Sequence, residues 1–429
     1  MNLIVEQTVN KNGYNIHFIP TKKFKTLTFV VKLKAPLKRE TITKRALLQN
    51  VLREATKNYP GRTELQLKLD ELYGSVLFVD GAKRGEEHVV SFRLEVANER
   101  YLPDKEAVTE EALQLLAEMI YEPYVEDNHF SEAIVKREKA TLKQRIQAIR
   151  DDKIRYANRR LIDEMCKDEA FSIHVNGYEE DLDALTAEDL YDYYLQMLQK
   201  DRLDIYVVGD MDIESMEKSI ASAFKQEERA STKSSDRKES KQIDEPKEII
   251  EQEPIQQAKL HIGYRTNTVY ADDDYPALQV FNGLFGGFPS SKLFMNVREK
   301  NSLAYYASSQ VESHKGLLFV FSGIAPEDYE QARDIIREQM TEMKAGNFSE
   351  QEMNEAKDMI IHSLRETMDH NHGLVELFYQ QQLAGTNRSL EEVIDRISAV
   401  TKEDVIRVGE RIEEDTLYLL TAQGGEINE

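Results

Sequence analysis

Two parts of the chain repeat each other, and this internal repeat limits the fold more than any other feature of the sequence. The stretch FSEAIVKREKATLKQRI, starting at Phe130, lines up with FSEQEMNEAKDMIIHSL, starting at Phe348. After a shift of three residues, LTAEDLYDYYLQML from Leu185 matches VTKEDVIRVGERI from Val400, and RLDIYVVGD matches TLYLLTAQG. A repeat of about 215 residues is far longer than a solenoid unit, so it indicates a duplicated domain.

A charged segment separates the two copies. The residues between Phe224 and Pro254 are almost all charged or small and polar, and no aliphatic residue larger than alanine occurs from Lys225 to Gln242. Such a composition is typical of a flexible linker. We therefore expect an N-terminal domain over 1–224, a linker over 225–250 and a C-terminal domain over 251–429.

Strand patterns and helix patterns are mixed within each copy. Short apolar or alternating runs, such as TLTFVVKLKA, HVVSFRLEV and GLLFVFSGI, predict strands. Longer stretches with a period near 3.6, such as ALQLLAEMIYEP and AIVKREKATLKQRIQAI, predict amphipathic helices. Because helices follow one another in runs, we expect an α+β fold: two duplicated domains of about 210 residues, each a mainly antiparallel sheet packed with helices.

The composition limits the partners of the chain. Its net charge of −22 would repel nucleic-acid phosphates and acidic membranes, so neither is an expected partner. No apolar segment approaches the roughly 20 residues that span a bilayer, and no signal peptide precedes the first strand, which predicts a cytoplasmic protein. The single cysteine, Cys166, cannot form an internal disulfide and is expected to be a buried small hydrophobe.

The second copy carries a recognisable signature. The segment YPALQVFNGLFGGFPSSKLFMNVREKNSLAYYASS, from Tyr275 to Ser309, resembles the C-terminal domain of the insulinase/pitrilysin family of zinc peptidases. The resemblance is closest to the bacterial two-domain members related to mitochondrial processing peptidase. It implies a duplicated α+β fold in which the first copy holds zinc through an HxxEH motif on a helix and a glutamate on a later helix.

The residues at the implied zinc positions cannot perform this chemistry. Aligning Ala55-Thr56-Lys57 with the Gly-Thr and basic turn of the family places the motif on Ala46, Gln49 and Asn50, and the later glutamate falls on Arg145. The family chemistry needs two imidazoles on zinc and a carboxylate base. Alanine has no donor atom, amides are poor substitutes and a guanidinium repels a cation. We therefore expect no metal and no other cofactor in this chain.

The resemblance implies a different role for the second copy. Arg298 and Tyr305, in REKNSLAY, match an arginine and tyrosine pair that in the family holds the substrate backbone and stabilises the tetrahedral oxyanion. Directed N–H and O–H donors suit a developing negative charge. Without the resemblance, the same residues would be interpreted as a helix-end arginine and a tyrosine in the core of a strand.

Three further patterns have simpler interpretations. Gly283, Gly286 and Gly287 predict a turn before Ser290-Ser291, with a packing role rather than phosphate binding, because no complete phosphate-loop motif is present. The cluster His370-Asn371-His372, followed by Glu376, predicts a helix boundary, since histidines at i and i+2 diverge on a helix. Asp151-Asp152 is expected to be a solvated helix end.

These patterns lead to one functional hypothesis and two alternatives. The first is a non-zinc, substrate-binding subunit that completes the peptidase chamber of a zinc-bearing paralogue, which would form a heterodimer with it and act on unfolded or short peptides. The second is a non-catalytic scaffold or peptide-binding protein that keeps the peptidase fold. The third is an autonomous metallopeptidase with a relocated metal site. Retention of Arg298 and Tyr305 favours the first hypothesis.

Overall fold

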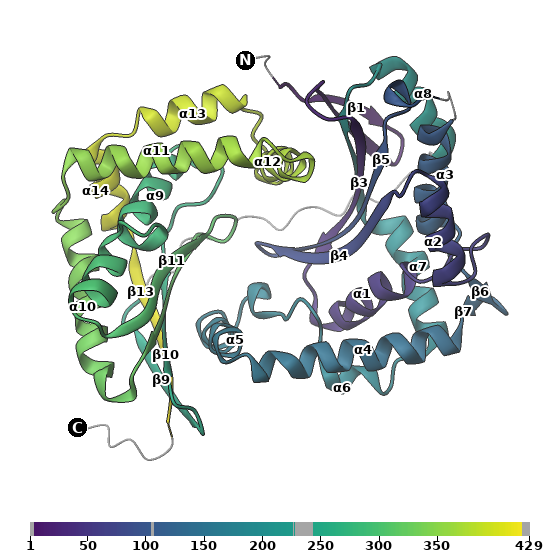
Figure 1. The fold of residues 1–429 in the computed structure, drawn as a ribbon. Coiled ribbons are helices and arrows are strands. Elements are labelled where there is room, and N and C mark those ends of the chain that lie inside the picture. The colour runs from purple at the N-terminus through teal and green to yellow at the C-terminus, as the bar shows by residue number, and fades with distance from the viewer. Residues whose placement is uncertain (1–3, 104–106, 226, 228–242, 423–429) are drawn as a thin grey trace. The chain divides into compact units, whose positions relative to one another are not determined.

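A computed structural model describes residues 4–103, 107–225, 227 and 243–422 (Figure 1). The described residues divide into two compact units, each with its own sheet and apolar core. Unit 1 takes its residues from 1–148, 173–236 and 368–379, and unit 2 takes its residues from 149–172, 237–367 and 380–429. Within the described ranges, no helix is long and apolar enough to cross a membrane.

Five strands of the unit 1 sheet follow the same order as the five strands of the unit 2 sheet, and β1 is an additional edge strand in unit 1. The order in unit 1 is β1-β2-β8-β3-β5-β4, and the order in unit 2, read in the corresponding direction, is β9-β13-β10-β12-β11. The pair β2–β8 is parallel and so is its counterpart β9–β13, whereas the other pairs are antiparallel. The strands of unit 1 are β1 (Gln7–Lys11), β2 (Tyr14–Pro20), β3 (Thr26–Pro36), β4 (Val76–Arg84), β5 (Glu87–Ala97) and β8 (Arg202–Gly209). Those of unit 2 are β9 (Lys247–Glu253), β10 (Ala258–Arg265), β11 (Ala304–Glu312), β12 (Leu317–Ile324) and β13 (Glu413–Ala422).

Most helices of each unit lie on one face of its sheet, which confirms the predicted α+β class (Figure 1). The helices on the unit 1 side are α1 (Arg39–Leu52), α2 (Arg62–Glu71), α3 (Val108–Tyr121), α4 (Glu132–Asp151), α6 (Glu179–Leu182), α7 (Ala187–Lys200) and α8 (Ile213–Ala223), with a two-stranded ribbon of β6 (Val125–Glu126) and β7 (His129–Phe130). Unit 2 contains α5 (Lys153–Met165), α9 (Tyr275–Asn282), α10 (Tyr329–Lys344), α11 (Glu350–Thr367), α13 (Leu390–Ser398) and α14 (Lys402–Glu410), whereas α12 (Asn371–Ala384) begins in unit 1. Short helical turns are η1 (Glu99–Tyr101), η2 (Ala170–Ser172), η3 (Gly283–Gly287), η4 (Phe294–Lys300) and η5 (Pro326–Asp328).

Local signals in the repeat produce matching helix starts. Helices α7 and α14 each begin with a complete capping box, in which Thr186 pairs with Asp189 and Thr401 pairs with Asp404. The cap hydroxyl accepts the Asp189 backbone N–H at 3.0 Å in the first helix and the Asp404 N–H at 3.2 Å in the second. Such caps satisfy backbone donors that the helix itself leaves unpaired. The structure therefore confirms the duplication that the sequence predicts.

Each unit also includes a segment from the other half of the sequence. In unit 2, α5 packs on β10 and β13, where Arg160 donates to Glu251. In unit 1, the first part of α12 packs on the sheet of that unit, where Lys32 on β3 donates to Glu376 at 2.6 Å. Strand β9 begins at residue 247, inside the linker expected over 225–250, and its residues pair with β13. Residues 228–242 of that linker lie outside the described ranges.

Cys166 confirms the prediction of a buried small residue. It lies fully buried at the end of α5, in a cluster with Leu161 and Phe171. Burial raises the pKa of the Cys166 thiol to about 12. The thiolate is the reactive form, so this cysteine is chemically inert at neutral pH.

A buried histidine joins the N-terminal segment to the sheet of unit 1. His17 on β2 bonds through Nδ1 to Glu6 and through Nε2 to Asp204, 3.2 Å away, and its ring stacks on Tyr206. Burial disfavours the charged ring, but the hydrogen bonds to Asp204 and Glu6 prevail and raise the pKa of His17. The protonated ring can donate to both carboxylates at once.

This arrangement predicts a pH-dependent contribution to stability. The stabilisation is fully present below about pH 6.5, the usual histidine pKa, and is lost as the pH rises through the raised pKa of the folded state. Replacement His17→Gln should therefore lower the free energy of unfolding by about 1–3 kcal/mol at pH 6 and by less at pH 9. Urea unfolding at several pH values measures this difference, with the exposed His362→Gln as control. A deficit that does not change with pH would contradict the prediction.

Candidate functional site

The positions aligned with the zinc motif lie on a buried face of α1. Ala46 is completely buried, and the side chains of Gln49 and Asn50 are more than nine-tenths buried. The helix packs against β4, the strand at one edge of the sheet. The sequence therefore placed these residues correctly on one helix, but their environment is a packed interior.

The donor set at these positions does not fit the zinc of the peptidase chemistry. Ala46 offers no lone pair, and Gln49 and Asn50 present neutral amides in place of a carboxylate base and an imidazole. Arg145, at the position of the third ligand, is exposed on α4. These four positions therefore provide no metal-dependent step of peptide hydrolysis. The expectation that the chain binds no cofactor stays a prediction.

A buried arginine beside Ala46 organises this region, and sequence reasoning missed it. The Arg45 guanidinium donates to Asp201 at 2.6 Å, to Nδ1 of His88 at 3.0 Å and to the backbone oxygen of Leu33 at 3.1 Å. Burial disfavours its charge, but the Asp201 carboxylate outweighs that effect and raises the pKa of Arg45. The partners lie between 12 and 156 residues away in the sequence, so no local pattern around Arg45 indicates them.

Two buried carboxylates share arginine partners near the end of α1: Glu54 follows that helix, and Glu138 lies on α4. Glu54 accepts hydrogen bonds from Arg62 and Arg137, and Arg137 also donates to Glu138 at 3.0 Å. The arginines reach these acids from the surface, whereas Glu54 and Glu138 are almost completely buried. Glu138 on α4 is thus part of an arginine–carboxylate cluster.

The predicted arginine and tyrosine of unit 2 are exposed. Arg298 lies in η4 with its guanidinium 4.6 Å from the centre of the Phe294 ring and 3.7 Å from a carboxylate oxygen of Glu299. Tyr305 is 73% exposed at an irregularity of β11, where the register shifts between Ala304 and Tyr306. A bulge re-aims a side chain that regular pairing would direct onto a packed face.

No hydrogen bond joins Arg298 to Tyr305 in the described part of the chain, and both side chains reach solvent. The alternative of a tyrosine in the strand core therefore does not apply to Tyr305, although its neighbour Tyr306 is half-buried. A ligand has direct access to both donor groups. Their use in substrate binding stays a prediction.

The glycine-rich stretch differs from the expected turn. Gly283, Gly286 and Gly287 continue α9 as one helical turn, η3, and the chain reverses only at residues 288–290. A Cβ at Gly286 would lie 2.6 Å from Oγ of Ser309, so this glycine permits close packing on β11. Ser291 accepts a hydrogen bond from the Phe294 N–H at 3.5 Å, near the start of the next helix.

The remaining predicted clusters are structural. Helix α12 begins at Asn371, as expected, and its Glu376 accepts hydrogen bonds from Lys32 and Arg84. Burial raises the carboxyl pKa, but Lys32 and Arg84 prevail and lower the pKa of Glu376 to about 2. Asp152 caps α5 by accepting the Arg155 N–H at 3.1 Å, which confirms the predicted helix end.

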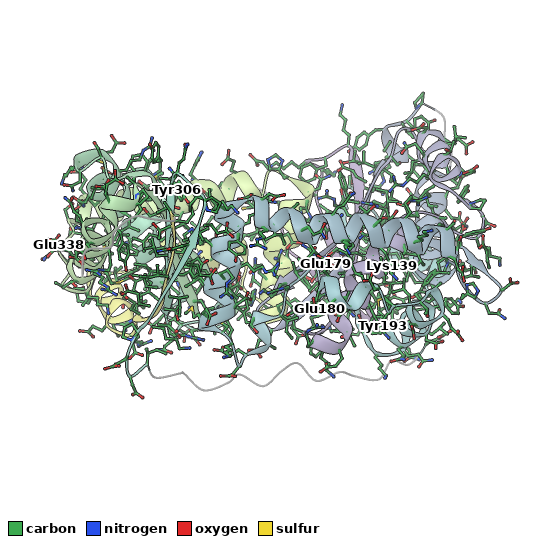
Figure 2. All side chains as sticks on the ribbon, turned by 90° about the horizontal axis from the view of Figure 1, so that it is seen from below. Lys139, Glu179, Glu180, Tyr193, Tyr306 and Glu338 are labelled. Carbon is green, nitrogen blue, oxygen red and sulfur yellow. The ribbon has the colours of Figure 1, made fainter. Side chains whose placement is uncertain are left out.

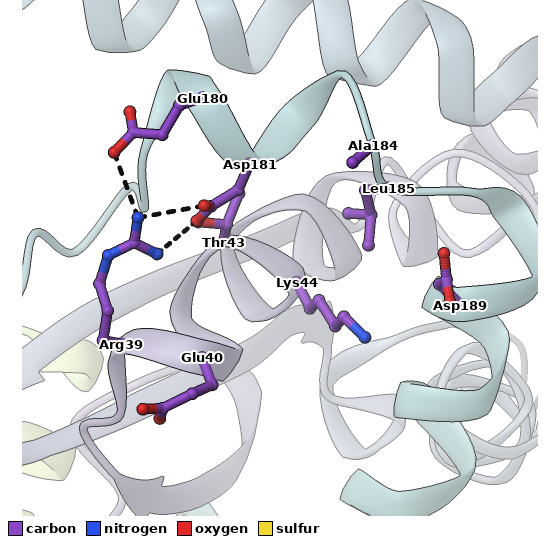
Figure 3. Close-up of a pocket in the computed structure, with 9 residues that line it drawn as sticks. All are labelled: Arg39, Glu40, Thr43, Lys44, Glu180, Asp181, Ala184, Leu185 and Asp189. Carbon is purple, nitrogen blue, oxygen red and sulfur yellow. Dashed lines mark hydrogen bonds and ion pairs between the residues drawn. The ribbon is translucent and has the colours of Figure 1, made fainter.

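A polar pocket of about 350 Å³ opens beside the first turns of α1 (Figure 3). One wall is fixed by Arg39, which pairs with Asp181 and Glu180 and lies over the ring of Tyr178. Glu180 belongs to the short acidic helix α6, which lies beside α4 (Figure 2). The lining residues are Arg39, Glu40, Thr43, Lys44, Glu180, Asp181, Ala184, Leu185 and Asp189. The pocket thus contacts the helix that carries positions 46, 49 and 50, on its N-terminal part.

Comparison with known proteins identifies the family. The chain is 49% identical to the "Probable inactive metalloprotease YmfF" of Bacillus subtilis over 99% of its own length and 100% of that protein. The family model described as "Peptidase M16 inactive domain" matches residues 184–360. The chain belongs to the M16 peptidase family. The resemblance to insulinase-type peptidases that the sequence predicted is therefore confirmed.

Other relatives and solved structures cover most of the chain. An "Uncharacterized zinc protease YmxG" of Bacillus subtilis is 24% identical over 73% of this chain and 75% of that protein. A conserved protein of Enterococcus faecalis superposes with a TM-score of 0.89 at 34% identity, covering 97% of this chain and 99% of the other. A peptidase M16 inactive domain of Pseudomonas fluorescens has the same fold, with a TM-score of 0.81, 17% identity and 99% of each chain covered.

The buried ion pair of Arg45 gives a prediction for stability. Replacement Arg45→Met leaves the Asp201 carboxylate buried without its cation, which should cost about 3–5 kcal/mol of unfolding free energy. Replacement Arg145→Met, at the exposed position of the third ligand, should change it by less than about 0.5 kcal/mol. Urea unfolding of both variants measures the contrast. Equal losses of unfolding free energy in the two variants would contradict the prediction.

Proposed function

We propose that the chain is a non-zinc, substrate-binding subunit that completes the peptidase chamber of a zinc-bearing M16 paralogue. The observation that carries the proposal is the exposure of Arg298 and Tyr305 in unit 2. In unit 1, by contrast, the positions of the zinc motif hold residues that do not fit the metal. The chain thus offers donors for a substrate but lacks the groups that activate water.

The two exposed side chains have the chemistry that a peptidase needs beside its metal. A guanidinium and a phenol donate directed hydrogen bonds to an oxygen on which negative charge develops. In the proposed heterodimer, the partner supplies zinc and the base, and this chain supplies Arg298 and Tyr305. The partner, the peptide substrate and a cytoplasmic location are all parts of the proposal.

The edge of the unit 1 sheet supports peptide binding. Strand β4 is the last strand of its sheet, and Val76 and Phe78 on it are each 47% exposed. An extended peptide can pair with the backbone of an edge strand, while apolar side chains on the strand contact its residues. An unfolded peptide therefore suits this surface better than a folded protein does.

Two of the relatives come from one organism and differ in their description. Bacillus subtilis strain 168 encodes both the relative that is described as a probable inactive metalloprotease and the more distant one that is described as a zinc protease. One organism therefore contains one protein of each described kind. We propose that the present chain likewise acts together with a zinc-bearing M16 paralogue.

A second candidate function is a non-catalytic scaffold or peptide-binding protein with the M16 fold. The observation that favours it is the description of the 49% identical relative as probably inactive. In this case the edge strand β4 would still bind peptide, but Arg298 and Tyr305 would have no effect on hydrolysis. The two candidates therefore differ in a measurable property of the same two residues.

Reconstitution distinguishes the two candidates. The chain is purified alone and together with a zinc-bearing M16 paralogue from the same organism, and cleavage of a fluorogenic unfolded peptide is followed. Activity that requires both chains, and that falls by about 10²-fold with Arg298→Ala or Tyr305→Phe, is the expected result, because each variant removes one donor to the oxyanion.

The matched control is Arg365→Ala, which removes an exposed arginine on α11. It should leave the rate of the reconstituted pair unchanged. Hydrolysis that is equally fast without this chain, or that persists in both site variants, would favour the scaffold. Hydrolysis by the chain alone with bound zinc would overturn both candidates.

A further inference from the structure

Segment η4, which carries Arg298, is a π-helix that Asn296 joins to the rest of unit 2. Nδ2 of Asn296 donates to the backbone oxygen of Lys292 at 2.9 Å and to Oε1 of Gln339 at 2.8 Å. Gln339 is buried on α10, so the second bond ties a surface segment to the interior of the unit. A π-helix is uncommon in proteins and occurs frequently at functional sites.

The remaining polar atoms of Asn296 are occupied as well. Its Oδ1 accepts from Nζ of Lys300 at 3.0 Å, and its backbone oxygen accepts from Nδ2 of Asn301 at 2.6 Å. The backbone oxygen of Lys292 can only accept, so the nitrogen of the Asn296 amide must face it. Both amide protons are therefore used, and a side chain without the amide would release η4 from α10.

The two side chains of Asn296 and Arg298 lie on different sides of η4, because residues two apart on a helix do not face each other. Asn296 contacts α10, whereas the Arg298 side chain is 43% exposed. The segment packs both on α10 and on β11, the strand that carries Tyr305. The bond from Asn296 to Gln339 therefore sets the side of η4 from which Arg298 reaches solvent.

The ring of Phe294 restrains the Arg298 side chain directly. The centre of the ring lies 4.6 Å from Cζ of Arg298, four residues further along the same segment. Residues four apart on a helix are neighbours, and an aromatic face attracts a guanidinium. The ion pair of Arg298 in the described residues is with Glu299, at 3.7 Å. The guanidinium donors thus stay accessible to a ligand, while the ring limits the directions in which they point.

We propose that Asn296 and Phe294 are positioning residues for Arg298: the amide fixes the helical segment, and the ring restrains the guanidinium. The inference deepens the proposed function and rests on it, because the position of Arg298 matters only if Arg298 acts on the substrate. A donor to a developing oxyanion is effective when it is aimed before the reaction begins. The rate of hydrolysis then depends on two residues that act through a third.

The test is kinetic and uses the full chain, reconstituted with a zinc-bearing M16 paralogue from the same organism. The variants are Asn296→Ala and Phe294→Leu, each made in the wild-type chain and in the Arg298→Ala background. Phe294→Tyr keeps the ring. The matched control is Asn347→Ala, because Asn347 is an exposed amide that bonds to Glu342. Calorimetry gives the Tm of each variant, and kcat and KM for a fluorogenic unfolded peptide are measured below the lowest Tm.

We expect Asn296→Ala to lower kcat about tenfold and Phe294→Leu about threefold with KM nearly unchanged, because a donor to the oxyanion acts in the transition state. Phe294→Tyr and Asn347→Ala should keep the wild-type kcat. In the Arg298→Ala background the first two substitutions should cause no further loss, since no guanidinium is left to position. Equal losses in both backgrounds would reveal a purely structural role and overturn the inference.

Two other outcomes separate this inference from the function on which it rests. If the wild-type pair is active and Arg298→Ala lowers its rate, but the variants at Asn296 and Phe294 keep the full kcat, this inference fails and the proposed function stands. If the wild-type pair does not cleave the peptide, or if Arg298→Ala leaves its rate unchanged, both proposals fail.

Discussion

The buried ion pair between Arg45 and Asp201 is the interaction on which the region around α1 depends. It joins α1 to the residue that ends α7, and the same guanidinium reaches the backbone of β3 and the ring of His88 on β5. A buried cation requires such a complete set of acceptors, because an unpaired charge would not remain in an apolar interior. Together with the apolar packing of α1, this side chain fixes the helix against the sheet.

The same interaction explains why replacing the metal ligands leaves a folded domain. Zinc sites often contribute folding energy directly, so a chain that lacks the ligands must hold the helix in another way. Here Ala46 packs into the core, and Arg45 supplies the polar connections between the helix and the sheet. Beyond the helix, Glu54 and Glu138 are neutralised by arginines rather than by a metal. The charge balance of the region is thus complete within the protein chain.

Much of the fold could be predicted because its signals are local. The capping boxes at Thr186 and Thr401, the cap at Asp152 and the alternation of the strands are each encoded within a few residues. The placement of α5 and of residues 368–379 could not be predicted, because each packs on the sheet of the other half of the sequence. The glycines of 283–287 were assigned to a turn because glycine favours turns, but they continue the helix, and Gly286 packs closely against Ser309.

The candidate site shows the same division between local and distant information. Alignment was sufficient to recognise that Ala46, Gln49, Asn50 and Arg145 do not suit zinc, since ligand chemistry is a property of residue type. The tautomer of His88 could not be derived in this way, because it depends on a hydrogen bond from Arg45, which is 43 residues away in the sequence. That bond decides whether the ring offers a lone pair or a proton at Nε2.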